Sequence, residues 1–180
     1  MAKQPKNNTQ KSQWPLEIFE TLKDAEISQV SYVPDAGHSE LIKYCHADNR
    51  IKTTRLTTEE EGVALALGAW LGGERSALLM QSSGVGNCIN MFSIIQETRS
   101  PLLVLVTMRG EWGEFNPWQL PMGQGTANSL EDAGLVVYHV DKAEDLSETI
   151  YAASQIAFNS YRAVAVLIGQ RIIGFKDWRK

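Results

Sequence analysis

The chain contains six short runs of strand length, five of them mainly apolar, and these runs constrain its fold more than any other feature. Each has the length of a β-strand, and the stretches between them carry apolar residues at helical spacing or turn residues. Strands that are apolar on both faces must be covered on both faces, as in a parallel sheet. The pattern predicts one doubly wound α/β domain with a six-stranded, mostly parallel sheet and helices on both faces. The predicted strands span 27–33, 51–56, 76–81, 101–108, 136–140 and 163–168.

The segments between these runs predict the covering helices and one long loop. Residues 1–13 are basic and polar with nothing to bury, so we expect a flexible tail there and the folded domain over 14–180. The segment 109–121 mixes aromatic residues, prolines and charges without either period, which predicts a loop. The predicted helices begin at Trp14, before Leu41 and near Glu59, cover 86–97, occupy the second half of 122–134, and cover 143–160.

Composition excludes several classes of protein. The 180 residues, 43% of them hydrophobic, suffice for one core, and the net charge of −4 without a basic stripe argues against a nucleic-acid partner. Cys45 and Cys88 are the only cysteines, so we expect buried thiols in a reducing compartment and no thiolate zinc site. The apolar runs are too short to span a bilayer and the N-terminus lacks a signal-like apolar segment, which predicts a cytoplasmic protein.

The stretch 57–70 is polar and acidic for one turn and then almost wholly apolar. Threonines before glutamates offer a capping box, so a helix is expected to begin near Glu59 and to end at Gly72-Gly73. Small residues alternate with large ones along it without a polar face, which is typical of a helix surrounded by protein. Glu59 is the acid that the preceding strand delivers to the carboxyl edge of the sheet. The alternative capping pairs are Thr57 with Glu60 and Thr58 with Glu61.

Ligands of doubly wound domains bind beyond the carboxyl ends of the strands, where the connecting loops gather. One such connection, 82–87, follows a strand and opens a helix, so that its backbone amides can approach a ligand closely. It lacks the third glycine of a dinucleotide fingerprint, because position 89 is Ile89, and the chain has no Walker A sequence. Both a tight structural turn and a ligand site remain open. The four segments expected at this edge are 35–38, 57–59, 82–87 and 109–124.

The histidines predict no metal site in this chain, because they are far apart and show no metal-ligand spacing. His46 and His139 are expected at the surface or at a strand end. His38 follows Asp35 in a loop at the predicted site, where it could contact a substrate or cap the next helix. We keep both roles for His38 open.

Four motifs of this chain stand in register with those of a known family, and they span 56–62, 68–71, 77–87 and 101–106. Together they resemble the pyrimidine-binding domain of thiamine-diphosphate-dependent 2-oxo acid decarboxylases, over roughly Val30 to Gly134. Arg109-Gly110 and the run 119–123 make the chain similar, more narrowly, to the alpha subunits of sulfopyruvate decarboxylases, with phosphonopyruvate decarboxylases as near relatives.

This resemblance implies roles for particular residues. Glu59 would be the catalytic residue, holding N1′ of the cofactor's aminopyrimidine in a proton relay. The connection after the third strand would lie beside the pyrimidine, and a second group would face the substrate. The cofactor-binding group is Ser83, Gly84, Val85, Gly86 and Asn87 together with Glu59. The substrate group is Asp35, Gly37, His38, Arg109 and Gln119, with Arg109 as a source of positive charge.

The resemblance also implies a second chain. Enzymes of this family hold Mg²⁺ and the diphosphate of thiamine diphosphate through a Gly-Asp-Gly motif followed by paired asparagines. No Asp-Gly dipeptide occurs in these 180 residues. We therefore expect the metal and the diphosphate on a beta subunit, with this chain as the alpha subunit of a hetero-oligomer. The small-residue helix after Glu59 is expected at the subunit contact.

The expected reaction is the conversion of 3-sulfopyruvate, or a similar small anionic 2-oxo acid, to the aldehyde and CO₂. A phosphonopyruvate decarboxylase subunit and a carboligase subunit are alternatives within the same chemistry. A regulatory module that binds a nucleotide or phosphate at 82–87 without catalysis is the alternative from another class.

Overall fold

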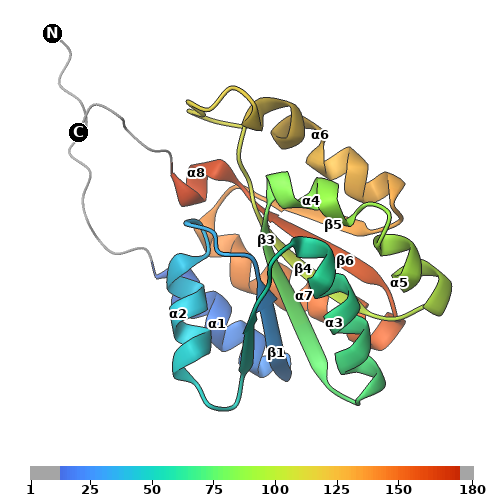
Figure 1. Cartoon of the computed structure of the whole chain (residues 1–180). Coiled ribbons are helices and arrows are strands. Elements are labelled where there is room, and N and C mark those ends of the chain that lie inside the picture. The colour runs from blue at the N-terminus through green and yellow to red at the C-terminus, as the bar shows by residue number, and fades with distance from the viewer. Residues whose placement is uncertain (1–12, 175–180) are drawn as a thin grey trace, which may run out of the picture.

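A computed structural model describes residues 13–174, and all six of its strands belong to one sheet. The sheet order is β2-β1-β3-β4-β6-β5, and all five neighbouring pairs are parallel (Figure 1). The predicted fold class and all six predicted strands are confirmed. Of the predicted tail 1–13, all but Gln13 lies outside the described residues. The strands are β1 (Ile27–Tyr32), β2 (Lys52–Arg55), β3 (Arg75–Gln81), β4 (Leu102–Thr107), β5 (Val136–Val140) and β6 (Ala163–Ile168).

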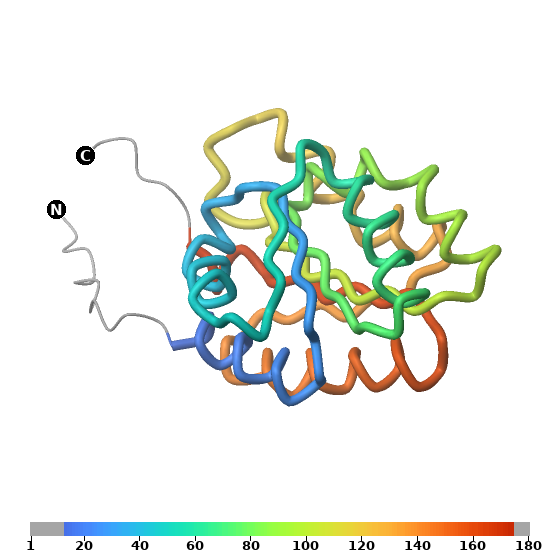
Figure 2. The backbone as a smooth tube through the Cα atoms, turned by 60° about the horizontal axis from the view of Figure 1, so that its bottom comes forward, coloured from blue at the N-terminus to red at the C-terminus, as the bar shows by residue number. Residues whose placement is uncertain are grey.

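Helices cover the sheet on both faces (Figure 2). One face packs against α1, α2 and α7, which contribute Ile18, Leu41 and Ile150 to the first core cluster. The other packs against α3 to α6, whose Phe92 and Leu130 belong to the second. The helices are α1 (Trp14–Asp24), α2 (Ser39–Ala47), α3 (Glu59–Leu71), α4 (Ser82–Cys88), α5 (Phe92–Thr98), α6 (Gln119–Asp132), α7 (Leu146–Ser160, preceded by a 3₁₀ turn at Ala143–Asp145) and α8 (Gln170–Ile173).

The central strands are apolar on both faces, as predicted, but the two edge strands are not. All residues of β4 and β6 are buried, whereas most residues of β2 and β5 are half-buried or exposed. An edge strand has a sheet neighbour on one side only, and its margins reach solvent, so polar residues such as Lys52 and Arg55 are tolerated there. The prediction of two apolar faces was therefore wrong for β2.

The chain reverses its direction across the sheet at β1 and β3. From β1 it passes outward to β2 and then returns to place β3 on the other side of β1. The connections that leave β1 and β3 therefore diverge, which opens a crevice at the carboxyl edge between them. Asp35 follows β1 in the chain and Ser82 follows β3 directly, so this edge brings together two of the four predicted segments.

Three helix boundaries differ from the prediction. The predicted helix over 86–97 is two helices, α4 and α5, separated by a turn at 89–91. Helix α4 begins at Ser82, directly after β3, so the whole predicted turn 82–87 is helical. Helix α6 begins at Gln119, inside the predicted loop, because Pro121 lies in the first turn, where a missing N–H costs nothing. Helix α8 was not predicted.

Both cysteines are free and buried, as predicted. Removal of the thiolate from water raises the pKa of Cys45 and of Cys88 to about 12. Neither thiol is therefore nucleophilic at neutral pH. Within the described residues, no helix is long and apolar enough to cross a membrane.

Candidate functional site

Glu59 is the first residue of α3 and lies against α4. Glu59 is 8% exposed, and its Oε2 accepts a hydrogen bond of 2.7 Å from Asn87 Nδ2. A Cβ added at Gly84 would stand only 2.3 Å from Glu59 Oε1. Glycine at this position therefore makes the space that the carboxylate occupies. The structure brings Glu59, Gly84 and Asn87 together, although 25 residues or more separate Glu59 from the other two in the chain.

The start of α3 is capped differently from both predicted capping boxes. Thr58 is the N-cap residue, but its hydroxyl donates to the Glu60 carboxylate instead of accepting from the backbone. Glu61 Oε2 accepts from the backbone N–H of Thr57 at 2.8 Å. Glu60 and Glu61 thus form hydrogen bonds at the helix start, as expected, and Glu59 takes no part in this capping.

Helix α4 has one exposed and one buried face. Ser83, Gly86 and Asn87 are exposed, while Gly84 and Val85 are buried, and the Val85 side chain packs in the second core cluster. The spacing of the exposed residues, i, i+3 and i+4, places them on one side of the helix. Within the predicted cofactor group, these three are open to a ligand, whereas Val85 is placed in the core.

A network of hydrogen bonds links the connections that leave β1 and β3. Gln81 Nε2 donates to Asp35 Oδ1 at 2.8 Å, which spans the crevice between the two strands. Gln81 Oε1 accepts from Ser83 Oγ at 2.9 Å and from Gln119 Nε2 at 3.3 Å. The Gln81 amide, which the sequence did not single out, therefore links Ser83 of the predicted cofactor group to Asp35 and Gln119 of the predicted substrate group.

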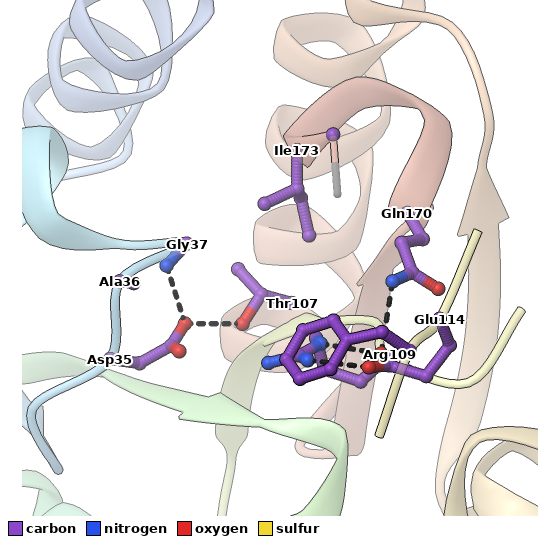
Figure 3. A pocket seen from close by; sticks show the side chains of 10 residues that line it. Asp35, Ala36, Gly37, Thr107, Arg109, Glu114, Gln170 and Ile173 are labelled. Atoms are coloured by element: carbon purple, nitrogen blue, oxygen red, sulfur yellow. Dashed lines mark hydrogen bonds and ion pairs between the residues drawn. The ribbon is translucent and has the colours of Figure 1, made fainter. Parts of the chain in front are cut away.

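A cavity of about 160 Å³ lies next to this network. Figure 3 shows Asp35, Gly37 and Thr107 on one side of it and Arg109 with Glu114 and Gln170 on the other. Asp35, Gly37 and Arg109 were predicted to face the substrate. Gln119, Glu59 and Asn87 do not line this cavity. The remaining lining residues are Ala36, Phe115, Ile173 and Gly174.

Asp35 is held by four donors. Its Oδ2 accepts from the backbone N–H groups of Gly37 and His38, at 3.0 and 3.3 Å, and from Thr107 Oγ1 at 2.6 Å. Gln81 satisfies its other oxygen. These donors offset the negative charge of the carboxylate, which fixes the loop after β1 against the end of β4.

Arg109 forms a two-pronged ion pair with Glu114. Its Nε and Nη2 each donate to the Glu114 carboxylate at 2.7 Å, and the Glu114 side chain is 1% exposed. Backbone N–H groups of Gly110 and Asn116 also donate to this carboxylate. The Arg109 hydrogen bonds, followed by the backbone bonds, hold the pKa of Glu114 down to about 2 against its ordinary 4.5. Burial opposes this shift.

We expect Glu114→Gln to lower the free energy of unfolding by on the order of 3 kcal/mol at neutral pH. A carboxyl whose folded pKa is depressed contributes stability above its unfolded pKa, here near 4.5, and loses this contribution as the pH falls through about 2. The difference in the free energy of unfolding between variant and wild type should therefore narrow as the pH falls from about 4.5 to about 2. Urea unfolding at a series of acidic pH values measures it, and a constant difference would contradict the assignment.

His38 is fully buried and does not line the cavity. Its Nε2 lies 3.1 Å from the carbonyl oxygen of Leu105, and its side chain does not cap α2. Removal of the imidazolium from water lowers the pKa of His38, with Asp35 opposing the shift. In this structure His38 joins the loop to β4 and is not in a position to touch a substrate in the cavity.

Thr107, Glu114 and Gln170 are site residues that the sequence reading missed. Thr107 and Gln170 stand at or just beyond the carboxyl ends of β4 and β6, so their strand position alone was a usable signal. Glu114 lies in the predicted loop, but no local pattern indicates that it pairs with Arg109. Around the third histidine, Glu111 and Asp141 approach His139 Nε2 to 3.1 and 3.8 Å, an exposed group with three potential metal ligands that spacing could not reveal.

No protein-family model matches the chain. Its fold is similar to a solved 2-oxoglutarate:ferredoxin oxidoreductase from Magnetococcus marinus, with a TM-score of 0.70 over 89% of this chain and 29% of that chain, at 14% identity. This likeness shows the class of fold, a doubly wound α/β domain with a six-stranded parallel sheet.

Relatives narrow this class to a family. The chain is 33% identical to sulfopyruvate decarboxylase subunit alpha of Methanococcus maripaludis, over 84% of this chain and 91% of the relative. The corresponding subunit of Methanocaldococcus jannaschii is also 33% identical, over 84% and 90%. Phosphonopyruvate decarboxylase of Streptomyces viridochromogenes is 32% identical, over 71% of this chain and 32% of the relative. The chain belongs to the family of sulfopyruvate decarboxylase alpha subunits.

Proposed function

We propose that the chain is the alpha subunit of a heteromeric decarboxylase that uses thiamine diphosphate to convert 3-sulfopyruvate, or a similar anionic 2-oxo acid, to the aldehyde and CO₂. The observation that carries this proposal is the Glu59 carboxylate, held beside Gly84 and next to the exposed face of α4. The names of the relatives and the length over which they match support the same reading.

The residues around Glu59 fit an aminopyrimidine. Asn87 occupies Oε2, whereas Oε1 forms no hydrogen bond with any described residue. The free oxygen of a largely buried glutamate is suited to a ring nitrogen with which it can share a proton. The exposed Ser83, Gly86 and Asn87 offer a small, polar surface beside it. When bound, thiamine diphosphate supplies the electron sink for the carbon that loses CO₂.

Glu59 is assigned to hold and move the proton at its Oε1, and Arg109 to bind the anionic group of the substrate. The two bonds to Glu114 use Nε and Nη2 of Arg109, and Nη1 forms no hydrogen bond with any described residue. This nitrogen belongs to a cavity-lining side chain and can donate to a sulfonate or carboxylate oxygen. Asp35, already satisfied by four donors, orders the opposite wall.

A beta subunit is assigned to hold Mg²⁺ and the diphosphate. The exposed face of α3 supports this assignment, because it is apolar and unpartnered in the single chain. Leu65 and Leu71 are 41% and 78% exposed, and small residues between them would permit close approach of another chain. The expectation that α3 is surrounded by protein was wrong for this chain alone, since only one side of the helix is covered. Beyond Glu61, which is also exposed in the first turn, the exposed positions are Ala64, Leu65, Gly68 and Leu71 on α3 and Gly72 at its C-cap.

The test compares the chain alone with the complex that copurifies with its partner. Alone, it should neither bind thiamine diphosphate tightly in calorimetry nor release CO₂ from 3-sulfopyruvate, whereas the complex with Mg²⁺ should do both. Full activity of the isolated chain would refute the split site. Tight nucleotide binding by the isolated chain, without thiamine diphosphate, would favour the regulatory module.

Phosphonopyruvate is the second candidate substrate, because the chain is 32% identical to a phosphonopyruvate decarboxylase over 71% of its length. A guanidinium can bind either a sulfonate or a phosphonate. The comparison of kcat/KM for the two acids, measured on the same complex, decides between them. Detection of a ligated product instead of the aldehyde would identify a carboligase.

A further inference from the structure

Gln170 is a buried amide that holds the loop carrying Arg109. It is the first residue of α8, directly beyond β6, and it is 1% exposed. Its Oε1 accepts from the backbone N–H groups of Glu111 and Trp112, each at 2.9 Å. Its Nε2 donates to Glu114 Oε2 at 3.0 Å (Figure 3). One side chain therefore binds both the main chain of the loop and the carboxylate that orients Arg109.

The loop is also tied to the backbone of Gln170. Glu111 Oε2 accepts from the Gln170 N–H at 3.0 Å, and Glu111 Oε1 lies 3.1 Å from His139 Nε2 on β5. The loop after β4 is thus attached to the ends of β5 and β6. Removal of the Gln170 side chain would leave the Glu111 carboxylate bonded to the Gln170 backbone, but would remove one donor from Glu114 and the acceptor of two loop N–H groups.

The chemistry of the position calls for an amide. The loop presents two N–H donors and one carboxylate acceptor to Gln170, which is itself buried, so this side chain must accept and donate at once. An ionised glutamate could accept but not donate, and it would stand next to the negatively charged Glu114. Methionine fills a similar volume but offers neither function.

We propose that Gln170 is a positioning residue for substrate binding: through Glu114 it sets the orientation of the Arg109 guanidinium in the cavity. The proposal rests on the proposed function, in which Arg109 binds the anionic group of the 2-oxo acid. Gln170 itself also lines the cavity, at the side occupied by Glu114. Its effect should therefore fall on KM for the anionic substrate, and only weakly on kcat.

The variant Gln170→Glu tests the proposal in the assembled enzyme. A protonated carboxyl group has one donor and one acceptor, as the amide has, and an ionised one has no donor. We expect KM to rise about tenfold near pH 8 and to approach the wild-type value toward about pH 6, with kcat nearly unchanged. Gln170→Met should raise KM at both pH values. Titratable or charged groups nearby are Arg109, Glu111 and Glu114 on the loop, His139 on β5, Asp141 after β5, Arg171 on α8 and Asp35 after β1.

Because the hydrogen bond to Glu111 raises the pKa of His139 above its ordinary value, the Gln170→Met profile and the wild-type profile measure the contribution of His139 separately. Gln155→Glu is the matched control: it makes the same chemical change on α7, where Gln155 bonds to Asn159, and should leave KM unchanged. A wild-type KM for Gln170→Glu at every pH, or a loss confined to kcat, would overturn the proposal.

Hydrogen exchange gives a second readout that does not depend on activity. The amides of Glu111 and Trp112 should exchange slowly in the wild type and at least about tenfold faster in Gln170→Met. Fast exchange in the wild type would refute the proposal even if no variant folded. If the wild-type complex decarboxylates no anionic 2-oxo acid, the proposed function fails. In that case, unchanged exchange of the Glu111 and Trp112 amides in Gln170→Met would also overturn the assignment that Gln170 holds the loop. Faster exchange would support that assignment.

Discussion

Replacement of Glu59 with glutamine should lower kcat of the assembled enzyme by about 10²–10⁴-fold and leave assembly intact. Glutamine has the same shape and can still accept the Asn87 hydrogen bond through its oxygen. It cannot take up or give back a proton, so the relay at Oε1 is lost while the packing against Gly84 remains. Steady-state decarboxylation assays, with size-exclusion chromatography of the complex, measure the two effects.

Glu60→Gln is the control for this experiment, because Glu60 stands next in the chain and bonds to Thr58 at the helix start. Its kcat should stay within about twofold of the wild type. A wild-type rate for Glu59→Gln would exclude Glu59 from the proton relay. Equal losses in both variants would instead indicate damage to the start of α3.

Gly84→Ala should reduce kcat/KM by about 10²-fold, although it adds a single methyl group. The new Cβ would stand 2.3 Å from Glu59 Oε1, and α4 cannot retreat because Val85 and Cys88 anchor it in the core. Glu59 must therefore leave its position beside Asn87. Activity and thiamine diphosphate affinity of the complex, with the melting temperature, measure the displacement.

The control for Gly84→Ala is Gly125→Ala on α6, where the nearest atom to the added Cβ is Ser129 Oγ at 4.0 Å. This variant should retain wild-type activity, since alanine favours the helix and meets no neighbour. Wild-type activity in Gly84→Ala would contradict the prediction, because it would show that Glu59 can act without its close packing against α4.

The sheet and the central helix were predictable because their signals are local. The apolar runs of β3, β4 and β6 and the small-residue pattern of α3 depend only on neighbouring residues, and burial follows from them. The carboxyl-edge rule then placed Asp35, Glu59 and Arg109 in segments that meet at one end of the sheet. Their individual roles stay predictions.

The rest of the candidate site depends on contacts between distant segments. Gln170 is 56 residues from Glu114 in the chain, and nothing in the polar C-terminal run indicates that its amide is buried. His38 could not be assigned either, because the same loop position fits a side chain turned toward the cavity or toward Leu105. Local propensity also gave no reason to end a helix between Cys88 and Phe92, since both residues are apolar and face the same core.

The amide of Gln81 uses both of its functional groups, one toward Asp35 and the other toward Ser83 and Gln119. It cannot rotate without breaking all three bonds. A ligand that draws Ser83 or Gln119 away therefore alters the support of Asp35, and a ligand at Asp35 acts back on Ser83. If ligands bound beside both Asp35 and Ser83, thermodynamic reciprocity would make their effects on each other's affinity equal.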